Sequence, residues 1–149
     1  MPSTPLPSQG NGQPSAPRAL RIVSLTVKAD RVVCEMAIAP GFPHNTTPEL
    51  AERLCARFPD LPAHTCKNPE GDTFAAVMGH TSIPHLLEHL VIDLQAHDSP
   101  GQAATFVGTS EWADRDAGLA RIEVSFTDDL SALRAFRDGA HILDNALLE

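Results

Sequence analysis

The chain has 149 residues, of which 42% are hydrophobic and 20% charged, and its formal net charge is −8. This length and composition predict a soluble globular protein with one domain and a core of its own. The basic residues are scattered, which argues against nucleic acid or an anionic membrane as a partner. No apolar run approaches the roughly 20 residues that span a bilayer, and the N-terminus lacks the apolar core of a signal peptide, so we expect a cytoplasmic protein.

The first 17 residues differ from the rest in composition. They contain five prolines among Ser, Gln, Gly and Asn, which predicts a disordered tail before a single folded domain at 18–149. The domain opens with two apolar segments, 19–29 and 31–40, and the turn residues between them predict a β-hairpin. Three cysteines, none in a C-x-x-C pair, argue against a disulfide framework.

A helix is predicted over 48–58, because the Thr47 hydroxyl can cap it and Pro48 suits its first turn. The proline-containing segment 59–72 is interpreted as a loop, and 73–79 fits either a helix or a strand.

A second helix is predicted after Ser82, which is a good N-cap residue. Pro84 again falls in the first turn, and the helix is expected to end near Gln95 or His97.

The last predicted elements are two strands, 103–112 and 119–128, joined by turn residues in a second hairpin. A final helix over 130–148 follows, with Asp128 or Asp129 as its cap. This order predicts an α+β fold: a mainly antiparallel sheet of about four strands, in two hairpins, packed against three helices.

The second helix carries three titratable residues in an apolar setting: His85, Glu88 and His89. On a helix, His85 and His89 stand one turn apart, so both imidazoles can bind one zinc ion. Glu88 lies near the same face and could act as general base, as in the H-x-x-E-H pattern of inverted zinc peptidases. The alternative is an amphipathic helix with surface histidines. The motif's apolar neighbours favour a buried metal site: Leu86, Leu87, Leu90, Val91, Ile92 and Leu94.

A zinc site needs a third protein ligand. Asp93, four residues after His89, could instead orient that imidazole from behind. Glu111 lies near the end of a predicted strand, where an inward-facing carboxylate would be unusual without a purpose. The full set of candidates is Glu111, Asp93, His97, Cys66, His80, Asp128 and Asp129.

A longer pattern surrounds the motif and couples a His-x-Cys loop to the helix. Its residues are Leu61, His64, Cys66, Gly71, Phe74, Thr81, His85, Glu88, His89, Leu94 and Gln95. In these residues the chain resembles the N-terminal domain of cyanophycin synthetase. The similarity is strongest over 58–95 and extends over 18–148. Pitrilysin-type peptidases and S-ribosylhomocysteinase share the H-x-x-E-H motif.

In the cyanophycin synthetase family, this domain is fused to ATP-grasp and ligase domains that polymerise aspartate and arginine. In some members of that family, the N-terminal domain is a zinc-dependent hydrolase that cuts the polymer to make primers. This chain has no phosphate loop, so we expect a standalone homologue. The resemblance implies that His85 and His89 bind zinc, with Glu88 as base and Glu111 as third ligand. Arginines of the family's Gly-Arg-Thr-Arg-Glu stretch are replaced around 108–110, so the resemblance by itself does not establish the family's polymer specificity for this chain.

The sequence therefore predicts a zinc-dependent hydrolase of peptide or isopeptide bonds, including a cyanophycin-like polymer as a candidate substrate. A non-catalytic binding module that retains the fold is the main alternative, and a small-molecule lyase or isomerase with the same metal site is another. Each of these three hypotheses is compatible with a homo-oligomer. Metal analysis of the purified protein separates these hypotheses most directly.

Overall fold

The computed structural model describes residues 18–99 and 105–149. A four-stranded antiparallel sheet forms its floor, in the order β1-β2-β6-β5. The strands are β1 (Leu20–Val27), β2 (Arg31–Ile38), β5 (Gly108–Asp114) and β6 (Leu119–Ser125). The two predicted hairpins are thus confirmed, and β2 and β6 join them into one sheet. The tail predicted for 1–17 lies outside the described residues.

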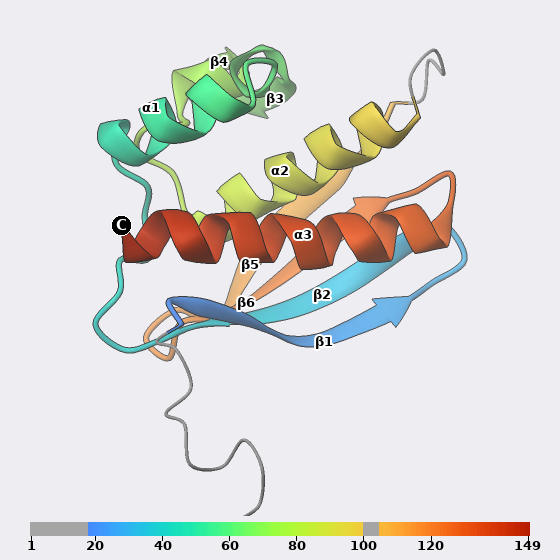
Figure 1. Cartoon of the computed structure of the whole chain (residues 1–149), viewed down its shortest axis with the longest axis horizontal. Coiled ribbons are helices and arrows are strands. Elements are labelled where there is room, and N and C mark those ends of the chain that lie inside the picture. Colours follow the sequence, from blue (N-terminus) through green and yellow to red (C-terminus); the bar gives the residue numbers. More distant parts are fainter. Residues whose placement is uncertain (1–17, 100–104) are drawn as a thin grey trace, which may run out of the picture.

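Two long helices lie side by side on one face of the sheet (Figure 1). α3 (Asp129–Leu148) packs on β1 and β2, whereas α2 (Ile83–Asp98) packs on β5 and β6. The third helix, α1 (Pro48–Arg57), contacts α3. The core lies between the sheet and the helices, because α2 and α3 bury their apolar faces there. The predicted α+β class, with an antiparallel sheet and three helices, is confirmed.

The helix starts follow the side chains that cap them. Thr47, Ser82 and Asp128 accept hydrogen bonds from the backbone N–H groups three residues further on, at the start of α1, α2 and α3. Asp128 is therefore the cap of the last helix, and Asp129 is its first residue. The Ser82 cap fixes where α2 begins, and so determines which helix turns carry His85 and His89.

The loop predicted over 59–72 is wrong in part. This segment contains a 3₁₀ turn (Leu61–Ala63) and nearly all of a hairpin of two short strands, β3 (Thr65–Asn68) and β4 (Gly71–Thr73). The next segment, 73–79, which fitted either a helix or a strand, contains a second 3₁₀ turn, Phe74–Ala76. The strands are short and polar, so they lack the apolar alternation that marks a strand in sequence. Side-chain bonds help to hold them, since the Asn68 amide donates to the backbone oxygens of Cys66 and Thr73.

The strand predicted over 103–112 starts later than expected, at Gly108. Residues 105–107 are not in a strand, and 103–104 lie outside the described residues. None of the helices in the described ranges combines the length and apolar character needed to cross a membrane.

Candidate metal centre

His85, Glu88 and His89 of α2 point into the molecule. His89 is 3% exposed and Glu88 is 5% exposed, whereas His85 is half-buried. The Phe74 ring stacks on the His89 ring, with centroids 4.0 Å apart, and lies edge-on to His85 at 5.0 Å. An amphipathic helix with surface histidines does not describe this arrangement.

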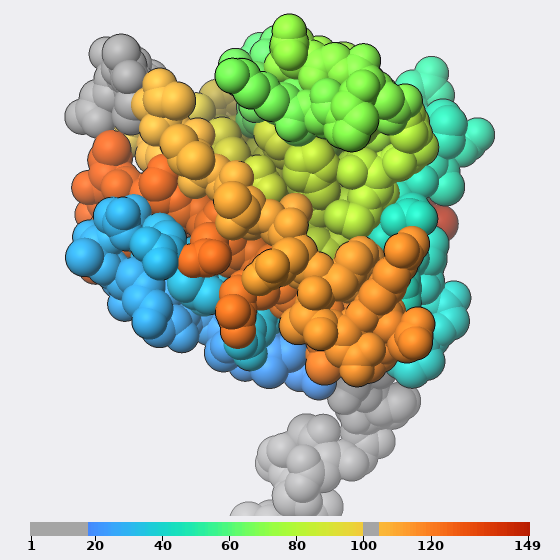
Figure 2. Space-filling view, turned by 180° about the vertical axis from the view of Figure 1, so that it is seen from behind, coloured from blue at the N-terminus to red at the C-terminus, as the bar shows by residue number. Residues whose placement is uncertain are grey.

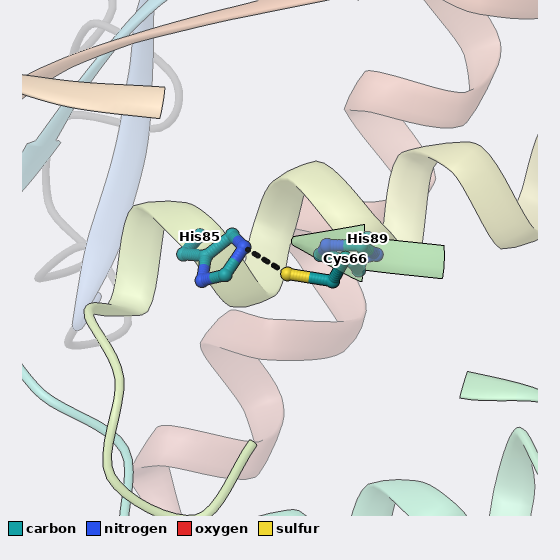
Figure 3. Close-up of side chains that lie close together, drawn as sticks. All are labelled: Cys66, His85 and His89. Atoms are coloured by element: carbon teal, nitrogen blue, oxygen red, sulfur yellow. Dashed lines mark hydrogen bonds between the residues drawn. The ribbon is translucent and has the colours of Figure 1, made fainter. Parts of the chain in front are cut away.

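Cys66 of β3 completes a group of three possible ligands with His85 and His89 (Figure 3). Each residue offers one ligand atom, and these atoms all lie within 4.8 Å of one another. The Cys66 Sγ and His85 Nε2 atoms are 3.5 Å apart. Tetrahedral zinc with bonds of roughly 2.3 Å to sulfur and 2.0 Å to nitrogen would separate these atoms by about 3.5 Å. Two imidazoles and one thiolate are also a donor set that suits zinc, so the residues present fit this ion.

Hydrogen bonds to the far ring nitrogens hold both imidazoles. His85 Nδ1 lies 2.8 Å from the Thr81 hydroxyl, and His89 Nδ1 lies 3.1 Å from His64 Nδ1. The chain continues from His64 Nε2 to Asp93 Oδ1 at 3.0 Å. The carboxylate can only accept, so His64 donates to Asp93 and its Nδ1 accepts from His89.

The chain that ends at Asp93 sets the tautomer of His89, and Thr81 is compatible with the same tautomer of His85. With Nδ1–H of His89 given to His64, the His89 ring keeps a free lone pair on Nε2. The Thr81 hydroxyl can accept from Nδ1–H of His85, and this tautomer leaves the Nε2 lone pair of His85 free as well. Such partners behind a metal-binding imidazole orient it and raise its basicity. Asp93 therefore does not contact His89 directly, as the sequence suggested it could, but is linked to it through His64.

Burial keeps the two imidazoles in the neutral form that binds metals. It lowers the pKa of His85, and together with the nearby charges of His85 and His64 it lowers the pKa of His89 to about 3. Neither ring needs to lose a proton at neutral pH before it can act as a ligand.

Glu88 lies beside Cys66, His85 and His89, and its side chain is buried and closely packed. Burial raises the pKa of its carboxyl group to about 7, although a hydrogen bond from Ser110 opposes the shift. Its Oε2 atom lies 3.7 Å from His89 Nε2. Gly108 makes room for it, because a Cβ atom at this position would lie 2.7 Å from Glu88 Cγ. A carboxyl group that titrates near neutral pH is suited to accept and return a proton.

Glu111 is not brought to the histidine pair. Successive side chains of a strand point to opposite faces, so Ser110 of β5 reaches Glu88 while Glu111 is exposed on the other face of the sheet. The remaining candidates also lie elsewhere: His80 is exposed beside Glu70, and Asp128 and Asp129 stand at the start of α3. Asp93 and His97 belong to a neighbouring group of side chains.

An open cavity of about 640 Å³ lies in front of the three candidate ligands. β3, the first turns of α2 and residues 105–110 line it, including Lys67, Phe106 and Thr109. Figure 2 shows this side of the molecule, where the segment before β5 and the β3–β4 hairpin lie on either side of α2. A ligand of several residues fits this space and reaches both the sulfur–imidazole group and Glu88.

Sequence reasoning gave no role to His64, although it belongs to the His-x-Cys pattern that holds Cys66. Its distance of 25 residues from His89 hides the contact. The His-x-Cys pattern is the signal that points to His64, because side chains two residues apart on an extended chain face the same side and can reach the same site.

Comparison with protein families supports the resemblance drawn from these residues. The model of the cyanophycin synthase-like N-terminal domain matches residues 31–148, which include every residue of the candidate centre. Comparison with curated proteins finds none that matches the chain. Because the family match covers most of its length, the chain belongs to the cyanophycin synthase-like N-terminal domain family.

Proposed function

We propose that this domain is a zinc-dependent hydrolase of peptide or isopeptide bonds, with Cys66, His85 and His89 as the metal ligands. The observation that carries the proposal is the convergence of a thiol and two neutral imidazoles beside a buried carboxyl group, in the lining of an open cavity. Cys66 takes the place that the resemblance gives to Glu111, because Glu111 lies on the far face of the sheet.

A zinc ion in this group would supply Lewis-acid activation of water and of the scissile carbonyl. The oxygen of the water molecule bonds to the carbonyl carbon, and Glu88 accepts the proton that the water loses in this step. The same carboxyl group then returns this proton to the leaving nitrogen as the C–N bond breaks, so the reaction consumes one water and leaves Glu88 unchanged. His64 and Asp93 hold His89 in its metal-binding tautomer throughout.

The test combines metal analysis with hydrolysis of a peptide panel that contains α- and β-aspartyl bonds. Wild-type protein supplied with zinc should retain it, and Cys66→Ser, His85→Gln and His89→Gln should each lose most of it. Glu88→Gln keeps the shape of the side chain and loses the base, so it should keep zinc while hydrolysis falls by ~10²–10⁴. Glu111→Gln is the matched control, and it should keep both zinc and activity.

The same panel contains the results that contradict the proposal. Zinc lost in Glu111→Gln and kept in Cys66→Ser would restore Glu111 as the ligand. Bound zinc with equally inert wild type and Glu88→Gln would favour the non-catalytic binding module. Wild-type protein that binds no zinc would exclude the zinc-dependent hydrolase proposed here.

A further inference from the structure

The two carboxylate oxygens of Asp93 have different surroundings. Oδ1 accepts the hydrogen bond from His64. Oδ2 is buried and has no hydrogen-bond partner among the described residues, on a side chain that is only 2% exposed. Leaving a buried carboxylate oxygen unpaired is costly, so a positive group is expected next to it.

Two further side chains of types that can bind metals lie near Asp93. His97, one turn later on α2, has its Nδ1 atom 3.4 Å from Asp93 Oδ2. Asp60, just before the 3₁₀ turn Leu61–Ala63, has its Oδ2 atom 3.6 Å from His97 Nε2. The three residues each offer one ligand atom within 4.8 Å of the others. The side chains of Asp60 and His97 are 74% and 55% exposed, so Asp93 forms the buried floor of a group that opens to solvent.

We propose that Asp60, Asp93 and His97 form a second binding site, for a divalent transition-metal ion. Two carboxylates and one imidazole are suitable ligands for zinc, manganese and ferrous iron. The two negative charges of the carboxylates balance the two positive charges of the ion. An ion on Asp93 Oδ2 gives a partner to the oxygen that lacks a hydrogen bond, and it leaves the Oδ1 bond to His64 intact. The site has no thiolate, so it binds zinc more weakly and less selectively than the group with Cys66.

The site is separate from the proposed catalytic centre, although His64 links the two through hydrogen bonds to Asp93 and His89. It shares no ligand with the Cys66 group. The inference therefore does not rest on the proposed function, and its test must count the two kinds of site independently.

The test is a metal titration of the full chain after removal of metal with a chelator, with Co²⁺ and Zn²⁺ as probes. Calorimetry and metal analysis should show two equivalents in the wild type, one tighter than the other. His97→Gln and Asp60→Asn should each lose the weaker equivalent and keep the thiolate-to-cobalt absorption of Cys66. Cys66→Ser should lose that absorption and keep the weaker equivalent. Asp93 is left unchanged, because replacing a buried carboxylate can unfold the chain.

His80→Gln is the matched control: His80 also pairs with a carboxylate, that of Glu70 at 2.6 Å, but it belongs to neither group. It should keep two equivalents. If His97→Gln and Asp60→Asn bind as much metal as the wild type, the inference is overturned, and His97 pairs with Asp93 as an ion pair only. If the wild type binds one equivalent that His97→Gln loses and Cys66→Ser keeps, this inference stands and the metal of the proposed function does not.

Discussion

The buried position of Glu88 lowers the stability of the fold when its carboxyl group is ionised. The pKa of its carboxyl group is about 7 in the folded protein against 4.5 for the exposed group. Below pH 4.5 the group is protonated in both the folded and unfolded states, so it contributes no difference. As the pH rises from 4.5 to 7, only the unfolded state ionises freely, and folding stability falls. The buried charge destabilises the fold above this window.

The prediction is that Glu88→Gln is more stable than the wild type at pH 8, by on the order of 1–3 kcal/mol, and equally stable near pH 4.5. Urea unfolding at both pH values measures the difference, with a chelator in every sample so that bound metal does not contribute. Both proteins keep the same histidines, so their titration cancels. A stability difference that does not change with pH would contradict the assignment of the buried charge.

Among the secondary-structure elements, the β3–β4 hairpin and α2 are held together by contacts of Phe74. Its side chain is fully buried and packs against both imidazoles, and its backbone N–H donates to the His64 carbonyl at 2.9 Å. The hairpin carries Cys66 and the helix carries the histidines, so this contact determines whether the thiol and the imidazoles stay together.

Phe74→Ala should therefore weaken zinc binding as well as stability, with a stability loss of about 3–5 kcal/mol. Phe136→Ala is the matched control, because Phe136 is equally buried, on α3, whereas the ring that packs against the imidazoles is that of Phe74. It should cost similar stability and leave zinc affinity unchanged, as measured by competition with a chromophoric chelator. An equal loss of affinity in both variants would show that the hairpin contact has no specific role.

For the whole molecule, the core between the sheet and its helices carries the stability. The proline-rich residues 1–17 have no apolar periodicity with which to join that core. A chain that starts at Arg18 should melt within a few degrees of the full chain, since 1 kcal/mol moves a domain of this size by about 2–4 °C. Thermal unfolding monitored by circular dichroism tests this, and a larger drop would mean that the first residues pack on the fold.

Local patterns were enough to predict most elements. The apolar segments around Ile22 and Ile122 gave the strands, and the hydroxyl or carboxylate side chains of Thr47, Ser82 and Asp128 marked where helices begin. The spacing of His85 and His89 placed them on one helix face, because that relation depends only on the pitch of the helix. These features involve residues close together in the chain, so the sequence shows them directly.

The rest of the centre depends on contacts between distant segments. Cys66 reaches His85 across 19 residues, and His64 reaches His89 across 25, through a hairpin whose polar strands have no recognisable alternation. The choice between Ser110 and Glu111 as the inward residue depends on the register of β5 against β6, where a shift of one position exchanges the two faces. The sequence by itself determined the elements and the histidine pair. Only the tertiary structure decided their partners, because pairing and packing set which side chains meet.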